Sequence, residues 1–381
     1  MEKTLNNKNC SGCGLCSLIC PKQCITLKKD KYGFLVPVVN EDNCIHCNKC
    51  VNGCELRQEE AKNFPLNIQA IQSRNKKILR KSTSGGAFYE VCKAFSKIYG
   101  KNINICGAAW EDNLILKHKI VNGIVSIGPL QKSKYIQSQA SVIFPKIKCL
   151  LSNNEFVIFC GTPCQVHALK LYLQKDYDNL LLIDFICHGT SNDLVLKNCI
   201  QASINTSLMD DIQYNFRVKY KLHKYPYSVK IVNNHKVYKM RNDHFHSLFF
   251  SGSITRPYCK ESCKYKNEHR YSDITISDCR GPEFKQVSSD LYSCVISNTE
   301  KGNNIVKRIS GVKFKNYNFN LLKRYNPCFY EIEQTNNNSI FDDEYLEDPI
   351  RKIKKYGYQK NFLSPKEIFL NKIGIKKRTN H

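Results

Sequence analysis

Two cysteine runs of identical spacing constrain this chain more than any other feature of its sequence. Both runs follow C-x2-C-x2-C-x3-C, the first over Cys10–Cys20 and the second over Cys44–Cys54, and Pro21 follows the first. In this pattern three thiolates of a run converge on one iron–sulfur cube, and the fourth cysteine reaches the cluster of the other run. Cluster one is therefore expected to use Cys10, Cys13, Cys16 and Cys54. Cluster two is expected to use Cys44, Cys47, Cys50 and Cys20.

A pair of zinc ribbons is the alternative, because zinc sites share the C-x2-C element. Zinc needs only four ligands, so two runs that each add x3-C match a dicluster ferredoxin better. Gly12, Gly14 and Gly53 allow the backbone to approach the sulfurs closely. Glu55 stands where a second proline is usual, which we expect to matter little. Cys24 lies just outside the first run and is expected to be a buried structural thiol.

Length and composition are those of a globular protein with several domains. The chain has 381 residues, 42% of them hydrophobic, and no apolar run approaches the length of a transmembrane segment. Because the first residues also lack the apolar stretch of a signal peptide, we expect a cytoplasmic protein. Nine of the 21 cysteines lie between residues 10 and 54. In a chain of this kind such clustering indicates metal binding or redox catalysis rather than disulfides.

The formal net charge of +25 is strongly basic. It can serve as a positive field that steers an acidic electron carrier, such as ferredoxin or flavodoxin, or an acidic or phosphorylated substrate. A solvated basic surface without a specific role is an equal alternative. No helix-turn-helix or basic–aromatic motif supports nucleic-acid binding, so we expect none.

Changes in composition divide the chain into four parts. We expect a ferredoxin domain over 1–60, a linker over 61–80, a mixed α/β domain over 81–310 and a basic C-terminal extension over 311–381. In the third part, strands predicted over 103–110, 115–121, 156–160, 180–187 and 273–277 alternate with helices over 87–99, 141–151, 163–174 and from 192. A hairpin is predicted over 227–240, around Asn233 and Asn234. The overall class is α+β, a bacterial-type dicluster ferredoxin domain followed by a mixed α/β domain.

Four further cysteines occupy positions where α/β proteins place their chemistry. Cys164 opens a predicted helix after a strand, Cys187 ends a strand, and Cys259 and Cys263 form a C-x3-C pair. Ligand sites in open α/β sheets gather at the carboxyl ends of the strands. Spacing alone leaves three alternatives open: a third cluster, a zinc ion, or two unrelated pairs of buried thiols.

Five short motifs occur in order through the same region. They are Lys81-Ser82-Thr83-Ser84-Gly85-Gly86, Lys134-Tyr135-Ile136-Gln137-Ser138, Gly161-Thr162-Pro163-Cys164-Gln165, Cys187-His188-Gly189 and Ser272-Asp273-Ile274-Thr275-Ile276-Ser277-Asp278. This series resembles the family of coenzyme F-420 hydrogenase/dehydrogenase beta subunits, from about residue 60 to 310, with the dicluster ferredoxin fused in front. The resemblance implies FAD and a third [4Fe–4S] cluster, with ligands Cys164, Cys187, Cys259 and Cys263. Cys160 and Cys279 are then bystanders.

The implied flavin has candidate contacts among the motif residues. The loop Ser82, Thr83, Ser84, Gly85 and Gly86 opens a helix, whose N–H groups can bind a pyrophosphate, although a plain helix cap is the commoner role of such a loop. The remaining candidates are Lys134 for a phosphate or flavin carbonyl, Gln137 and Ser138 for the ring edge, Asp184 and Asp278 near the ligand loops, and His188 as a catalytic proton donor. For each of these, an ordinary surface, capping or backbone-bonding role is the alternative.

The function expected from these observations is an iron–sulfur flavin-dependent oxidoreductase. It would pass electrons between a one-electron carrier, its clusters, FAD and a small-molecule redox substrate that accepts or donates hydride. Two rivals are a non-catalytic electron-relay subunit without flavin, and a metal-stabilised interaction module that docks through its basic tail.

Overall fold

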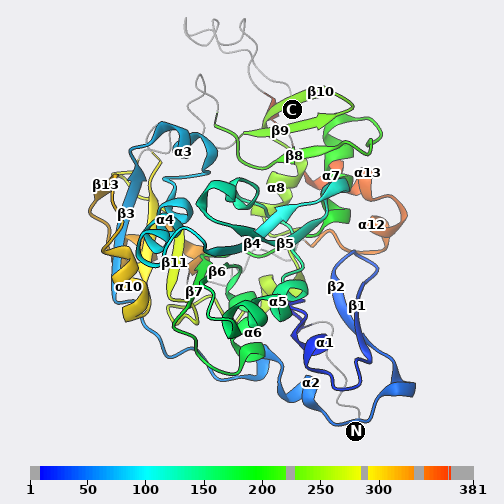
Figure 1. Ribbon diagram of the computed structural model, residues 1–381. Helices are drawn as coiled ribbons and strands as arrows, with labels where there is room; N and C mark the ends of the chain where they lie inside the picture. The colour runs from blue at the N-terminus through cyan, green and yellow to red at the C-terminus, as the bar shows by residue number, and fades with distance from the viewer. Residues whose placement is uncertain (1–8, 220–227, 285–290, 330–338, 359, 362–381) are drawn as a thin grey trace, which may run out of the picture.

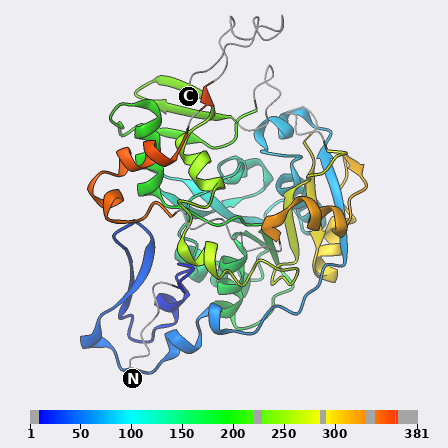
Figure 2. The same cartoon turned by 180° about the vertical axis from the view of Figure 1, so that it is seen from behind.

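The computed structural model describes residues 9–219, 228–284, 291–329, 339–358 and 360–361. Three sheets organise these residues, with two, four and eight strands (Figure 1). The two-stranded sheet belongs to residues 9–56, called here the N-terminal module, which lies at one end of the molecule in both views (Figures 1 and 2).

The N-terminal module consists of a hairpin and short helical turns that hold the cysteine loops. Its hairpin pairs β1 (Ile25–Lys29) with β2 (Leu35–Val39) in antiparallel register. Its helices are α1 (Leu15–Ile19) and α2 (Lys49–Asn52). Leu15 of α1 is buried in an apolar cluster shared with two helices of the main domain, so the module is docked on the rest of the chain.

The eight-stranded sheet is the centre of the main domain. Its strands, in spatial order, are β13 (Val312–Lys315), β3 (Asn67–Ser73), β12 (Ser293–Ser297), β11 (Ile274–Asp278), β7 (Leu180–Phe185), β6 (Val157–Cys160), β4 (Asn104–Trp110) and β5 (Leu116–Asn122). Strands β4, β6, β7 and β11 are parallel to one another. Strand β3 runs in the same direction as these four, because it is antiparallel to β12, which is antiparallel to β11. The carboxyl ends of five strands therefore lie along one edge, called here the carboxyl edge.

Alternate residues of the central strands face opposite helix layers, as the period of two requires. Ile158 and Leu181 pack against α4 (Ala87–Tyr99) and α10 (Glu300–Val306). Their neighbours Val157 and Leu182 pack against α5 (Phe144–Ser152) and α6 (Pro163–Leu173). Both faces are covered, which explains why these strands are nearly continuous apolar runs.

The four-stranded sheet lies beyond the large one, at the end of the molecule opposite the N-terminal module (Figure 1). Its order is β14 (Lys360–Asn361), β10 (Lys236–Asn242), β9 (Val229–Asn233) and β8 (Gln213–Asn215). The predicted hairpin is β9 and β10, and Asn234 and His235 turn the chain at positive φ, as a tight two-residue turn requires. An apolar cluster joins this sheet to α7 (Asp193–Ile204), α8 (His244–Phe250) and α13 (Pro349–Tyr356).

Two of the domain boundaries expected from the sequence differ from the structure. The expected linker over 61–80 contains β3, which pairs on both sides, and the short helix α3 (Lys76–Lys81). The expected extension after residue 310 begins with β13 of the large sheet and continues with α11 (Phe319–Tyr325), α12 (Asp343–Glu347) and α13. Ile353 of α13 is fully buried, so this part completes the core. Its last residues, 362–381, lie outside the described residues.

Candidate iron–sulfur and flavin sites

The thiols expected to bind cluster one lie together against the main domain. Cys16 interacts electrostatically with Cys10 and Cys54, and Cys13 interacts with Cys16. Burial raises the pKa of Cys16 and of Cys54 to about 12 each. Cys54, the last residue of the second run, thus lies with the first three cysteines of the other run.

The thiols expected to bind cluster two lie on the outer side of the N-terminal module. Cys50 interacts with Cys20 and Cys44, and Cys47 is exposed. Burial raises the pKa of the Cys20 thiol, but hydrogen bonds lower it by a larger amount, so the net pKa is below the usual value. These hydrogen bonds come from the backbone N–H groups of Lys22, Gln23 and Cys24 and from the Cys24 thiol.

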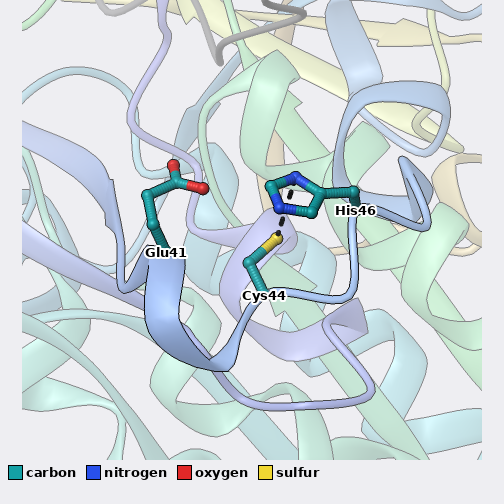
Figure 3. A group of neighbouring side chains, drawn as sticks. All are labelled: Glu41, Cys44 and His46. Carbon is teal, nitrogen blue, oxygen red and sulfur yellow. Dashed lines mark hydrogen bonds between the residues drawn. The ribbon is translucent and has the colours of Figure 1, made fainter.

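Cys44 also has two other potential metal ligands beside it. Glu41, Cys44 and His46 each offer a ligand atom within 4.8 Å of the others, and the Cys44 sulfur lies 3.9 Å from His46 Nδ1 (Figure 3). Glu41 and His46 are exposed, and exposed groups of this kind are common without a metal. Cys44 is already expected to bind cluster two, so this group is not a separate site.

The four further thiols converge at the carboxyl edge, and they are called here the four-thiol set: Cys164, Cys187, Cys259 and Cys263. Cys164 is in the first turn of α6, Cys187 follows β7, and the other two lie in and just after α9 (Pro257–Glu261). All four line one cavity, and Cys13 of the N-terminal module lines the same cavity. The structure therefore brings the four-thiol set together, next to the thiols expected to bind cluster one.

Hydrogen-bond donors around these sulfurs fit iron–sulfur clusters, whose sulfurs are tuned by such donors. Gly12 N donates to the Cys10 sulfur at 3.3 Å, and Thr162 Oγ1 lies 3.0 Å from the Cys164 sulfur. In contrast, burial alone raises the pKa of Cys106, which lies in the core. The thiols gathered at these positions, with such donors beside some of them, fit iron–sulfur clusters.

An arginine and a glutamine of the main domain hold the loop of cluster one. Arg256 donates to Cys10 O at 3.0 Å and Leu35 O at 2.8 Å, and to Gln137 Oε1 at 2.6 Å. Gln137 in turn donates to Gly12 O at 2.7 Å. A side chain at Gly12, where φ is +71°, would collide with both. Gln137, expected at a flavin ring edge, is thus placed at the junction of the two domains.

Glu55 contributes more than the sequence suggested. Its side chain is 2% exposed, accepts a 2.5 Å hydrogen bond from Ser11 Oγ, and lies 3.2 Å from the Cys13 sulfur and 3.5 Å from the Cys54 sulfur. Its carbonyl accepts from Lys264 of the main domain. The residue that replaces the second proline therefore contacts two of the thiols of cluster one.

The loop over residues 82–86 follows β3 and α3 and opens α4 at the carboxyl edge. Its three hydroxyls all have partners within the protein: Ser82 donates to Ile78 O, Ser84 donates to Tyr292 O, and Thr83 Oγ1 accepts from Ser133 N. Gly85 N donates to Ser293 Oγ, and Gly86 caps α4 in the left-handed conformation. A phosphate at this loop would have to use the first N–H groups of α4.

Two basic side chains lie beside this loop, and Lys134 donates to Gln131 O and Lys132 O, close to Ser133, which contacts the loop. Lys219 donates to Leu79 O and Ser84 O, and Arg217 forms a 2.9 Å ion pair with Asp278 at the end of β11. Burial lowers the pKa of Lys134 to about 7 and that of Lys219 to about 8. Burial opposes the effect of Arg217 at Asp278, but the guanidinium keeps the pKa of that carboxyl below its usual range. The positive charges of Arg217 and Lys219 beside the loop suit an anionic ligand.

Two expected flavin residues are buried within the protein. Ser138 lies 2.9 Å from His118 Nδ1 through its hydroxyl, and its carbonyl accepts from Gln165, the residue that completes the capping box of α6. Asp184 is fully buried within the sheet, where it accepts from Thr275 Oγ1, and burial raises its pKa. Their observed contacts are within the protein.

His188 is held by α8 and by the turn near residue 328. Its Nε2 lies 3.0 Å from Phe249 O and its Nδ1 lies 3.3 Å from the Cys328 sulfur. The carbonyl oxygen can only accept, so Nε2 carries a proton and Nδ1 faces the thiol. A proton-donor role would require one of these contacts to break.

The sequence reasoning assigned no role to Arg256, Arg217 or Lys219. Arg256 directly precedes Pro257 and the C-x3-C pair, and a cation beside a cysteine pair was the only available signal. Arg217 and Lys219 lie in a segment without a motif, so nothing in their surroundings indicated a site.

The comparisons with known proteins agree on both parts of the chain. Residues 9–56 match the 4Fe-4S dicluster domain family. Residues 154–315 match the family described as the C terminus of the coenzyme F420 hydrogenase/dehydrogenase beta subunit. The predicted family resemblance is confirmed. The N-terminal module thus resembles iron–sulfur domains, and residues 154–315 resemble the domain at the C terminus of those oxidoreductase beta subunits.

One curated relative and one solved structure also match parts of this chain. The F subunit of F(420)H(2) dehydrogenase from Methanosarcina mazei is 19% identical over 231 residues, 57% of this chain, and the chain spans 64% of that relative's length. The F420-reducing [NiFe] hydrogenase complex from Methanosarcina barkeri matches with 14% identity and a TM-score of 0.48, over 78% of this chain and 92% of that one. Among the described residues, no helix has the length and apolar character to cross a bilayer.

Proposed function

We propose that this protein is an iron–sulfur flavin-dependent oxidoreductase that passes electrons between a one-electron carrier and a small-molecule redox substrate. One observation carries the proposal. The four-thiol set and Cys13 of the N-terminal module line the same cavity, so a third cluster would lie directly beside cluster one. We propose two domains, a ferredoxin domain and a redox domain. The large sheet of the redox domain includes β3 and β13.

The twelve thiols proposed as ligands form three groups. Clusters one and two would use the crossed sets predicted from the two runs, and the third would use Cys164, Cys187, Cys259 and Cys263. Clusters of this kind, when bound, supply one-electron redox chemistry. The protein's own contribution is to bury the thiols, donate N–H bonds to them, and place Lys266 near Cys187 and Cys263, where its charge favours the thiolates.

The flavin part of the proposal depends on the carboxyl edge. The N-terminal turn of α4 would bind the phosphates with Lys134, Lys219 and Arg217 as countercharges, and Asp278 would orient Arg217. FAD, when bound, supplies the conversion between single-electron and hydride chemistry. Ser138, Asp184 and Gln137 would act by supporting the neighbouring loops through their observed contacts, and His188 remains the proposed proton donor.

The exposed side of cluster two is the proposed meeting point for an acidic electron carrier such as ferredoxin or flavodoxin. Cys47 is exposed there, and Ile45, with 55% of its surface accessible, offers an apolar contact. Lys22 and Lys49 are also exposed on these loops, and their charge complements an acidic partner. All 21 cysteines are free thiols, which suits a reducing compartment such as the cytoplasm.

Iron and flavin content of anaerobically purified protein test the proposal. Three clusters predict about twelve irons per chain, and the dicluster domain alone predicts about eight. Cys259→Ala should remove about four irons and leave the EPR signals of clusters one and two. The matched control is Cys106→Ala, a buried core thiol, which should keep the wild-type count. Eight irons in the wild type, unchanged by Cys259→Ala, would refute the third cluster.

A second candidate, an electron-relay subunit without flavin, is favoured by one observation. Every hydroxyl of the loop over residues 82–86 is already bonded within the protein. Acid-released flavin distinguishes the candidates. One FAD per chain, reduced in amount by Lys219→Met, supports the flavoprotein. A colourless supernatant with a full iron count supports the relay.

A further inference from the structure

A buried carboxyl lies in the large sheet close to the four-thiol set. Asp184 is fully buried in β7, three residues before Cys187. Its Oδ1 accepts a 2.5 Å hydrogen bond from Thr275 Oγ1 of β11, whereas its Oδ2 has no hydrogen-bond partner among the described residues. Burial raises the pKa of Asp184, and the nearby Ser272 hydroxyl opposes the rise, although its own hydrogen-bonding neighbours are Thr275 and Asn298. Protonation would remove the charge, which is the larger part of the cost of burying this group.

A second acceptor of the same network is also unpaired within the part of the chain that the structure describes. Asn298 donates through Nδ2 to Ser272 Oγ at 3.1 Å and to Thr275 Oγ1 at 2.9 Å, but its own Oδ1 has no partner there. The network around Asp184 is therefore short of protons. Asp273, next to Ser272 in the sequence, lines a second cavity that exposed residues also line, so a proton from water has a short way to the network.

Arg270 links Asp184 electrostatically with the four-thiol set. Burial raises the pKa of Asp184 and that of Cys263, and the charge of Arg270 opposes the rise at both groups. Arg270 also donates from Nη1 to Tyr265 O at 2.5 Å, and Tyr265 lines the cavity of the four-thiol set. On the other side of Asp184, burial and the Asp184 charge raise the pKa of Cys160 of β6 to about 12, so that thiol stays neutral. Arg270 is thus the charge that the carboxyl and the thiols share.

We propose that Asp184 binds one proton when one electron reaches the third cluster. The electron comes from the one-electron carrier of the proposed function, and the proton comes from water. One O–H bond forms on the carboxylate, one O–H bond of hydronium breaks, and no other bond changes. The driving force is charge, because an added electron makes the cluster site more negative and disfavours a second negative charge nearby at low dielectric constant. Once Asp184 is neutral, the charge of Arg270 acts on the reduced site alone.

The inference rests on the third cluster of the proposed function and not on the flavin. Wild-type protein with about eight irons and no third EPR signal would refute that part of the proposed function. The measurements below use protein that contains about twelve irons, in which they test Asp184 alone.

Redox titrations of the full-length protein, followed by the EPR signal of the third cluster, test the proposal. They are repeated over the whole pH range in which the protein keeps its iron. Uptake of one proton per electron predicts a window in which the midpoint potential falls by up to about 59 mV per pH unit, the value of a tenfold change for one electron. The window begins at the pKa of Asp184 in the oxidised protein and ends at its higher pKa in the reduced protein. Asp184→Asn should abolish this slope. Asp178→Asn, which changes an exposed acid just before β7, is the matched control and should keep it.

Infrared difference spectra detect the same proton directly. At a pH inside the window, the reduced-minus-oxidised spectrum of the wild type should contain the C=O band of a carboxylic acid, and that of Asp184→Asn should lack it. A potential independent of pH in the wild type would overturn the inference, and so would a slope or a C=O band that persists in Asp184→Asn. If Asp184→Asn loses the third cluster, Asp184→Glu takes its place. The C=O band must then shift from its wild-type position, and an unshifted band would overturn the inference.

Discussion

Replacement of Arg256 should loosen the N-terminal module without removing its clusters. The side chain is 2% exposed and donates three hydrogen bonds, two of them to carbonyl oxygens of the module, at Cys10 and Leu35. It also lies over the ring of Phe34, 5.0 Å from the centroid. Arg256→Ala therefore removes the donor of two contacts between the domains and leaves two partly buried acceptors without it.

The expected loss follows from those acceptors. A fully buried acceptor left without a donor costs about 1–3 kcal/mol; because these two are only partly buried and water can enter the gap, we expect about 1–4 kcal/mol for the docking of the module. Since about 1.4 kcal/mol corresponds to a factor of ten, the population of the undocked state should rise by a factor of roughly five to several hundred. The undocked population of Arg256→Lys should lie between those of the wild type and Arg256→Ala, because one ammonium group cannot reproduce the planar fork of the guanidinium.

Hydrogen exchange of the backbone amides of β1 and β2, measured by mass spectrometry, reports the equilibrium between the docked and undocked states of the module. Iron content should stay at the wild-type value, because Arg256 is bonded to the backbone of the loop and not to a thiol. The matched control is Arg308→Ala, which removes an exposed arginine and should leave the exchange rates unchanged. Exchange rates in Arg256→Ala within a factor of three of the wild type would refute the conclusion that Arg256 holds the N-terminal module on the main domain.

Three further substitutions test the main domain. Gly85→Ala places a Cβ against backbone atoms of both flanking strands and should lower the unfolding free energy by about 1–3 kcal/mol, whereas Gly128→Ala, with open space around it, should not. Asp278→Asn should cost about 1.5–3 kcal/mol by removing the charged partner of Arg217. Because folding lowers the pKa of Asp278, this difference should be complete above pH 4, roughly the unfolded pKa, and shrink as the pH falls below it, as urea unfolding at several pH values would show. Ile353→Ala should cost about 2–5 kcal/mol in the same assay, and no loss would mean that α13 is dispensable.

The sequence predicted the elements whose signals are local. The hairpin of β9 and β10 was visible in two apolar runs around an Asn pair, and α6 was visible in Thr162-Pro163 before a helical pattern. Cysteine spacing predicted the dicluster domain for the same reason, since the geometry of each cluster loop is set within a few residues.

Long-range pairing could not be predicted in this way. A change in composition after residue 60, leading into the basic run at 74–81, predicts a linker where the structure has strand β3. In the structure Gln72 is buried, and its amide donates to Leu291 O, 219 residues away in sequence. A buried polar residue with so distant a partner looks like a surface residue from the sequence alone.

In the candidate site, too, local motifs could be predicted from the sequence and contacts between the domains could not. The four-thiol set was assembled from motifs and the family resemblance, and the structure places its members around one cavity. Gln137 was expected at the flavin, yet its partner is Gly12 O, which belongs to another domain. No motif within the α/β region can indicate that its loops bind the N-terminal module.

These contacts join the two domains into a single structural unit. Arg256, Gln137 and Lys264 are main-domain donors whose acceptors are backbone carbonyls or side chains at the interface with the N-terminal module. If the module left, these donors would exchange their protein partners for water, and Leu15 would leave an apolar cluster exposed to water. A carrier that docked and departed in each turnover would have to bear that cost each time. We therefore expect the module to stay docked while an exchangeable partner meets the exposed side of cluster two.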